Sequence, residues 1–146
     1  MGVQVSSERL ILVSAKRKGE AKSLTESFLA GEKFATTRAW KQGTIDRFKR
    51  VQERGEAVRV QTNYGLWTLL GWVTIASILG PGDPISVVSE EVVVQAGCAG
   101  WSKEEYIDVF CSREDPEKGR VPVDTVVCIL FHRAWDRSAA EIDRLV

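Results

Sequence analysis

The chain is organised around the stretch FLAGEKFATTRAW, which covers residues 28–40. Gly31 is the residue that a helix end favours, because glycine adopts the left-handed conformation that turns the chain. Residues 34–40 then have the β-branched and aromatic content that is typical of a strand. We therefore predict a helix-to-strand junction at Gly31, with Lys33 at the mouth of the strand, next to the turn.

Three positions of this stretch, Gly31, Lys33 and Arg38, match the signature Gly-x-Lys-x-x-Glu-x-Arg of the ASCH family of PUA-like domains. Thr36 stands where most members carry glutamate, and some members have threonine there. The chain resembles this family from about residue 10 to residue 135. The resemblance implies an α+β fold, a small PUA-like mixed β-barrel flanked by short helices.

The family is associated with RNA binding, and some members resemble ribonucleases or amidohydrolases that act on modified nucleosides. Lys33 and Thr36 match the lysine and threonine of the amidohydrolase type, where lysine is a base or electrostatic stabiliser and threonine the nucleophile. The carboxylate of those members has no counterpart, because residues 96–100 contain no acid. Strand alternation also separates Lys33 from Thr36, so a shared site requires that Lys33 belong to the turn or that a bulge intervene.

The resemblance and the charges together predict a basic binding cleft. The candidate RNA-binding residues are Lys16, Arg17, Lys33, Arg38, Trp40, Lys41, Trp101 and Ser102, and the candidate catalytic residues are Lys33 and Thr36. Lys16 and Arg17 form a basic turn, for which a solvated linker is the alternative reading. Trp101 precedes a capping box that begins at Ser102, and ASCH members place this type of helix start at the cleft.

The formal net charge is zero, but the charges are unevenly distributed along the chain. Residues 1–59 carry 13 Lys or Arg against 7 Asp or Glu, whereas residues 60–146 carry 7 against 13. The predicted cleft lies in the basic half, and a local cationic face attracts phosphate groups over about 8 to 10 Å at ordinary salt. The alternative is that the two halves neutralise each other across the fold.

Length and composition predict one domain over residues 1–146, with the barrel at about 8–135 and a short helix at 138–146. A chain of 146 residues with 44% hydrophobic content can bury one core. No apolar run of membrane-spanning length and no secretory signal is present in the sequence, so we expect a cytoplasmic protein without a membrane partner. Cys98, Cys111 and Cys128 are widely spaced, which favours buried, reduced thiols and suggests no zinc site. We expect no cofactor.

Hydrophobic periodicity predicts the remaining elements. Strands are expected at 9–15, 58–62, 66–78, 85–94 and 124–133, and helices at 23–31, 43–54 and 102–111. Residues 80–84 read as a turn and residues 112–119 as a charged loop. Gly71 is where the long strand would bulge, and Trp67 and Trp72 are expected in the core.

These observations favour a domain that binds single-stranded RNA or a nucleotide. A metal-independent ribonuclease is a further reading, because no acidic or histidine cluster at metal-ligand spacing is present in the sequence. The alternatives are an amidohydrolase that acts on an N-acylated nucleoside and a non-catalytic module that binds an acidic protein.

Overall fold

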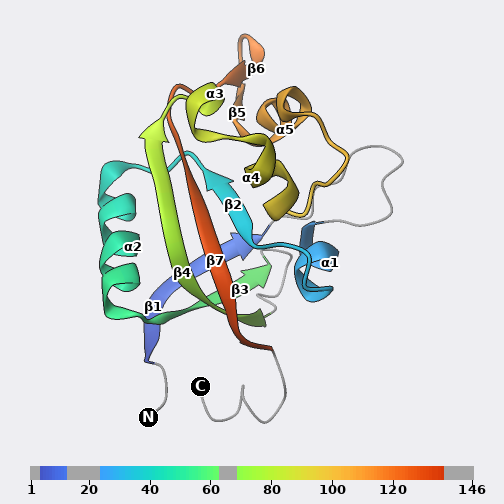
Figure 1. The fold of residues 1–146 in the computed structure, drawn as a ribbon. Coiled ribbons are helices and arrows are strands. Elements are labelled where there is room, and N and C mark those ends of the chain that lie inside the picture. Colours follow the sequence, from blue (N-terminus) through green and yellow to red (C-terminus); the bar gives the residue numbers. More distant parts are fainter. Residues whose placement is uncertain (1–3, 13–23, 63–68, 137–146) are drawn as a thin grey trace.

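The computed structural model describes residues 4–12, 24–62 and 69–136 (Figure 1). The strands are β1 (Val5–Leu12), β2 (Ala35–Arg38), β3 (Ala57–Thr62), β4 (Leu69–Gly82), β5 (Ser112–Asp115), β6 (Gly119–Pro122) and β7 (Val126–Asp136). The helices are α1 (Leu24–Leu29), α2 (Gln42–Arg54), α3 (Pro84–Val87), α4 (Glu90–Gln95) and α5 (Lys103–Phe110). The fold is a mixed α+β arrangement of one main sheet with short helices.

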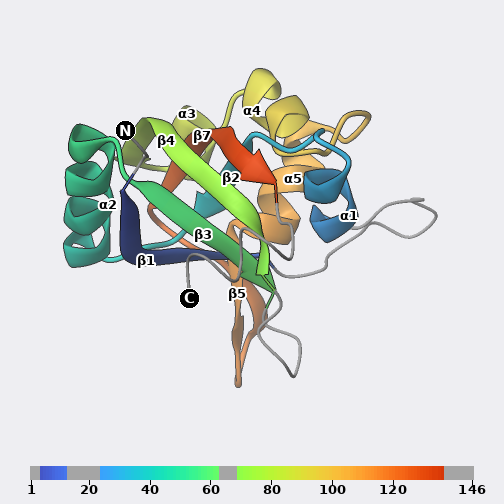
Figure 2. The ribbon, with the colours of Figure 1, turned by 90° about the horizontal axis from the view of Figure 1, so that it is seen from below.

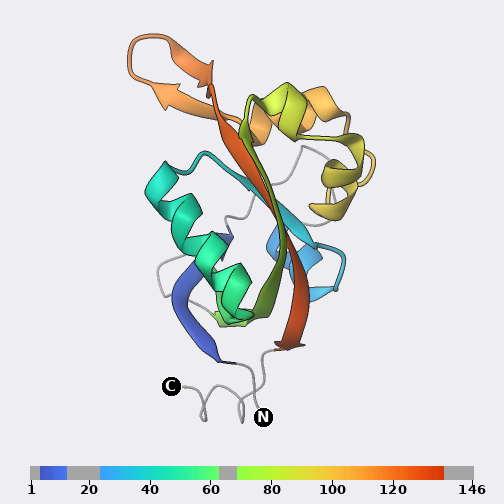
Figure 3. The same cartoon turned by 60° about the vertical axis from the view of Figure 1, so that its left-hand side comes forward.

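Five strands form the main sheet in the order β1-β3-β4-β7-β2. β1 runs parallel to β3, and the other neighbouring pairs are antiparallel. β5 and β6 form a separate hairpin, which projects from the body of the molecule (Figure 3). Among the described residues, β1 and β2 each pair on one side only, so backbone hydrogen bonds do not close this sheet into a barrel.

The long antiparallel pair of β4 and β7 forms the centre of the sheet and separates two hydrophobic cores. Side chains of β7 alternate between them: Val127, Ile129 and Phe131 point into the first core, whereas Val126 and Cys128 point into the second. This alternation explains why the strand is apolar on both faces.

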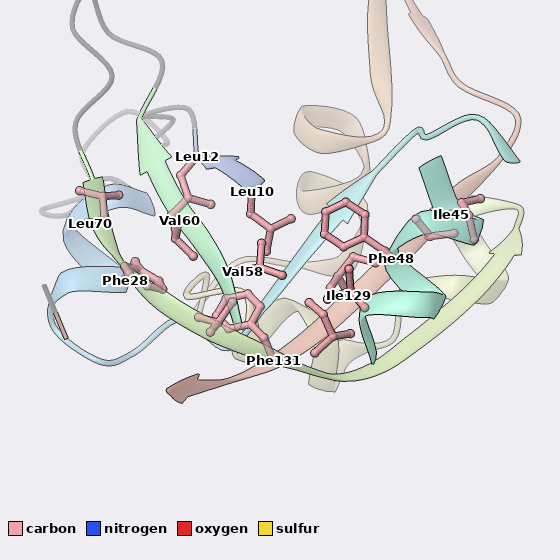
Figure 4. Close-up of a cluster of buried hydrophobic side chains, with 14 residues drawn as sticks. Leu10, Leu12, Phe28, Ile45, Phe48, Val58, Val60, Leu70, Ile129 and Phe131 are labelled. Carbon is pink, nitrogen blue, oxygen red and sulfur yellow. The ribbon is translucent and has the colours of Figure 1, made fainter. Parts of the chain in front are cut away.

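The first core lies between the main sheet, α2 and α1 (Figure 4). Ile45, Phe48 and Val51 of α2 contribute to it, as does Phe28 of α1. The second core is covered by α3, α4 and α5 on the other face of β7. Figure 2 shows α2 beside β1, with α4 and α5 on the far side of β7.

Several local predictions are confirmed. Gly31 has a φ of 77° and follows α1, and Gly55 has a φ of 65° and ends α2, as glycine C-caps do. The register between β3 and β4 shifts beside Gly71, so the predicted bulge is present. Trp72 is buried, whereas Trp67 lies outside the described residues. The predicted cap residue Ser23 and the terminal helix also lie outside them.

Three local predictions are wrong. Residues 85–94 lie in two short helices, with only Val88 and Ser89 extended between them, because Asp83 and Ser89 cap α3 and α4 with their side-chain oxygens. Residues 80–84 are not a free turn, since β4 continues to Gly82 with a register shift against β7. The predicted loop at 112–119 contains β5 and the start of β6.

Candidate functional site

Lys33 lies between the end of α1 and the start of β2, so it belongs to the turn, as a shared site would require. Its side chain is only 1% exposed, and its Nζ donates to the carbonyl oxygens of Ala35 at 2.6 Å and Ala96 at 2.9 Å. A Cβ at Gly97 would lie 3.4 Å from the Lys33 Cβ, so the segment after α4 packs directly against this lysine. Lys33 is therefore an interior residue and does not line an open cleft.

Burial is the largest cause that lowers the pKa of Lys33, the nearby charge of Arg38 lowers it too, and Cys98 opposes them; together they bring this pKa to about 7. Removing a charged ammonium group from water is costly, which explains the direction of the shift. Near neutral pH, a substantial fraction of the Lys33 side chains is therefore the neutral amine. Such an amine can act as a base or a nucleophile if a substrate reaches it.

Arg38 is half-buried and donates only to backbone carbonyls in the described part of the chain. Its Nη1 donates to the Thr37 carbonyl at 3.0 Å, and its Nη2 donates to the Ile11 carbonyl at 2.6 Å. Burial lowers the pKa of Arg38, but a guanidinium group remains charged at neutral pH. Ile11 is in β1, so Arg38 connects the two edge strands of the main sheet.

Thr36 is buried against the first core, where it pairs with Ile129 in the β2–β7 register. Its neighbour Thr37 points to the second core, where its Oγ1 shares a hydrogen bond of 2.8 Å with the Tyr106 hydroxyl. Thr37 Oγ1 also lies 3.3 Å from the Cys128 sulfur. Thr37, Tyr106 and Cys128 thus form a buried polar cluster, and the sequence predicts Thr36 but not Thr37 as a site residue.

The other described residues of the predicted site lie between β2 and α2 or just before α5. The half-buried Trp40 ring packs on Phe48 with centroids 4.3 Å apart, and Lys41 is exposed just before α2. Trp101 stacks on Phe110 at 5.8 Å. Ser102 caps α5, and both hydrogen bonds of its predicted capping box with Glu105 are present. Lys16 and Arg17 lie outside the described residues.

The exposed cations gather instead on α2. Arg47, Lys49, Arg50 and Arg54 are all exposed on this helix, which buries Ile45, Phe48 and Val51 on its opposite side. A groove of about 200 Å³ lies between the second half of α2 and the start of β1. The sequence predicts the basic face of α2 but not this groove, because its other wall comes from β1, about 40 residues earlier.

Two findings bear on possible partners of the described residues. They contain no group of three or more His, Cys, Asp or Glu side chains placed to hold a metal ion. None of their helices combines the length and the apolar character needed to cross a membrane.

Comparison with known protein families, with curated proteins and with solved structures finds no match to this chain.

Proposed function

We propose that this protein binds RNA or a nucleotide through its exposed basic surface. The observation that carries the proposal is the set of exposed cations on α2 and at the residue before it: Lys41, Arg47, Lys49, Arg50 and Arg54. In the described part of the chain, only Arg47 of this set has an ion-pair partner. Unpaired cations on one helix face supply the phosphate contacts on which nucleic-acid affinity depends.

We also propose that the fold is a PUA-like barrel of the ASCH type. Gly31, Lys33 and Arg38 match the family signature. Arg38 supports the barrel because its guanidinium group joins β2 to β1, two strands that do not pair with each other within the described residues. The partner class that this family implies, RNA, agrees with the basic face of α2.

Titration with a single-stranded RNA oligonucleotide at two salt concentrations tests the proposed function. Each phosphate contact releases counterions, so the affinity should fall steeply between about 50 and about 200 mM salt. Fluorescence polarisation of labelled RNA measures this directly. An absence of binding at low salt, or an affinity that salt does not change, would contradict the proposal and favour a protein partner.

Catalysis at Lys33 is a second candidate function, favoured by the lowered pKa of its amine. In this candidate reaction the RNA 2′-hydroxyl gives its proton to the Lys33 amine, and its oxygen attacks the adjacent phosphorus and displaces the 5′-oxygen, which leaves as a hydroxyl after it takes up a proton. A nearby cation would stabilise the negative charge that develops on the phosphoryl oxygens. Lys33 is only 1% exposed, so a substrate can reach it only if part of the surrounding structure moves; the segment around Ala96, which accepts a hydrogen bond from Nζ, is one such part.

Product analysis on RNA and DNA oligonucleotides, with a chelator present, tests this candidate. RNA should be cut and DNA should not, and Lys33→Met should abolish cutting. A parallel assay for acid release from an N-acylated cytidine distinguishes the amidohydrolase reading, in which loss of the nucleophile in Thr36→Val would abolish turnover. Loss of RNA cleavage on addition of the chelator would overturn the metal-independent mechanism.

A further inference from the structure

We propose that the groove between α2 and β1 is the site where the phosphates of single-stranded RNA bind; this inference rests on the proposed function and locates it. The groove has a volume of about 200 Å³, and Ser6, Glu8, Arg47, Arg50, Arg54 and Glu56 are among the residues that line it. Figures 1 and 3 show the start of β1 running beside α2. The proposed surface is thus separate from the buried Lys33.

The three arginines share one helix face because they are spaced by three and four residues. From Arg47 to Arg54 the helix rises about 10 Å, since each residue adds about 1.5 Å. Successive phosphates of a stacked strand are about 3.4 Å apart along the helix axis. The arginine row therefore spans about three spacings between successive phosphates.

The three arginines differ in whether they already have a hydrogen-bond or ion-pair partner within the protein. Nε of Arg47 lies 2.9 Å from a carboxylate oxygen of Glu8, and its Nη2 donates to the Thr44 hydroxyl at 3.2 Å. Arg50 and Arg54 make no hydrogen bond or ion pair within the part of the chain that the structure describes. Arg47 is thus fixed against the wall of the groove, while two guanidinium groups remain available for a ligand.

The charge balance of the groove favours an anion at Arg50 and Arg54. Glu8 is neutralised by Arg47, which leaves Glu56 as the second carboxylate of the lining. Arg50 and Arg54 are four residues apart on the helix, where like charges repel each other by a few tenths of a kcal/mol. An anion between them would relieve this repulsion, and the planar guanidinium fork matches two oxygens of a phosphate.

The experiment compares two double variants that remove the same charge from different surfaces. Arg50→Gln with Arg54→Gln removes two positive charges from the groove. Arg113→Gln with Lys118→Gln removes two from the β5–β6 hairpin, where both side chains are exposed. All four positions are exposed, so both variants should fold, which circular dichroism and thermal melting check.

We expect the groove variant to bind single-stranded RNA at least tenfold more weakly than the unmodified protein at low salt. Its plot of log affinity against log salt should be shallower by about 1.4, which corresponds to two lost contacts on a single strand. The hairpin variant should bind RNA with an affinity within about twofold of that of the unmodified protein, and its salt dependence should have the same slope.

The outcomes separate the two proposals. If the unmodified protein binds RNA and both variants weaken binding equally, the groove is not the site, although the proposed function stands. If the groove variant binds RNA as well as the unmodified protein does, the groove is likewise excluded as the binding site. If the unmodified protein does not bind RNA at low salt, the proposed function fails and this inference fails with it.

Discussion

Arg38 at the end of one edge strand donates a hydrogen bond of 2.6 Å to the carbonyl oxygen of Ile11 in the other edge strand. The same guanidinium group donates to the carbonyl of Thr37. Among the described residues, the two edge strands are thus joined by a side chain and not by strand pairing. Both hydrogen bonds of the Arg38 guanidinium group thus go to the protein's own backbone, so the role of Arg38 is structural.

Replacing Arg38 with methionine should therefore destabilise the protein. The hydrogen bond to Ile11 has a charged donor, and one such bond contributes about 1.5 to 3 kcal/mol, so we expect a loss of about this size in the free energy of unfolding. Denaturant titration measures it. The exposed Lys41→Met is the control and should change stability little. Equal stability of the two variants would show that the contact with Ile11 contributes nothing.

The buried Lys33 should make stability depend on pH. Its pKa is about 7 in the folded protein and near 10.5 in the unfolded chain, so the unfolded state holds more protons between these values. Stability should then rise as pH increases above about 7, with a slope of at most about 1.4 kcal/mol per pH unit.

The rise should level off above about pH 9, because groups with raised pKa values oppose it. Burial raises the pKa of Cys111 to about 11 and raises those of Cys128 and Tyr106. These groups therefore lose their protons at lower pH in the unfolded chain than in the folded protein, which favours unfolding at high pH. Chemical denaturation of the protein and of Lys33→Met across pH 6 to 9 isolates the lysine. The variant should lack the rise, and a parallel dependence in both proteins would exclude Lys33 as its source.

The elements that the sequence predicts correctly are those whose signals lie within a few residues. The capping box of Ser102 and Glu105 and the left-handed glycines at Gly31 and Gly55 are local chemistry, and all three mark helix ends in the structure. The prediction of a strand at residues 85–94 is wrong for a related reason. The β-branched residues there suggest a strand, but the N-caps Asp83 and Ser89 favour two helices.

The environment of the candidate site could not be predicted in the same way. The residue that accepts from Lys33 across the fold, Ala96, is 63 positions away and offers only a backbone carbonyl, which no side-chain pattern reveals. Tyr106 is 69 positions from Thr37. The sequence correctly places Lys33 in the turn just before a strand, but only tertiary packing determines that its amine points inward.

The hydrogen bond between Thr37 and Tyr106 should be visible as a coupling between two variants. Thr37→Val leaves the buried Tyr106 hydroxyl without this partner, which typically costs about 1 to 3 kcal/mol. Adding Tyr106→Phe removes that hydroxyl as well, so the double variant should lose less stability than the sum of the two single variants. Thr125→Val, at an exposed position, is the control. Strict additivity would contradict the coupling.

The three cysteines should report on how the interior opens. Cys98, Cys111 and Cys128 are all buried and form no disulfide, so a thiol reagent should react slowly with the folded protein and with three thiols per chain after denaturation. Cys98 lies next to Gly97, whose segment packs against Lys33, and it is followed by the exposed Gly100. Local opening there needs less disruption than exposure of Cys128 in the central strand.

We therefore expect Cys98 to be labelled first under native conditions, as peptide mass spectrometry can establish. Ala96 accepts a hydrogen bond from Lys33, so a movement of this segment that exposes Cys98 would also free the Lys33 amine from one of its two partners. Binding of a substrate at Lys33 should change the labelling rate of Cys98 and leave that of Cys128 unaltered. Labelling of all three thiols at one common rate would mean that Lys33 is reached only by global unfolding, and catalysis at this residue would then be excluded.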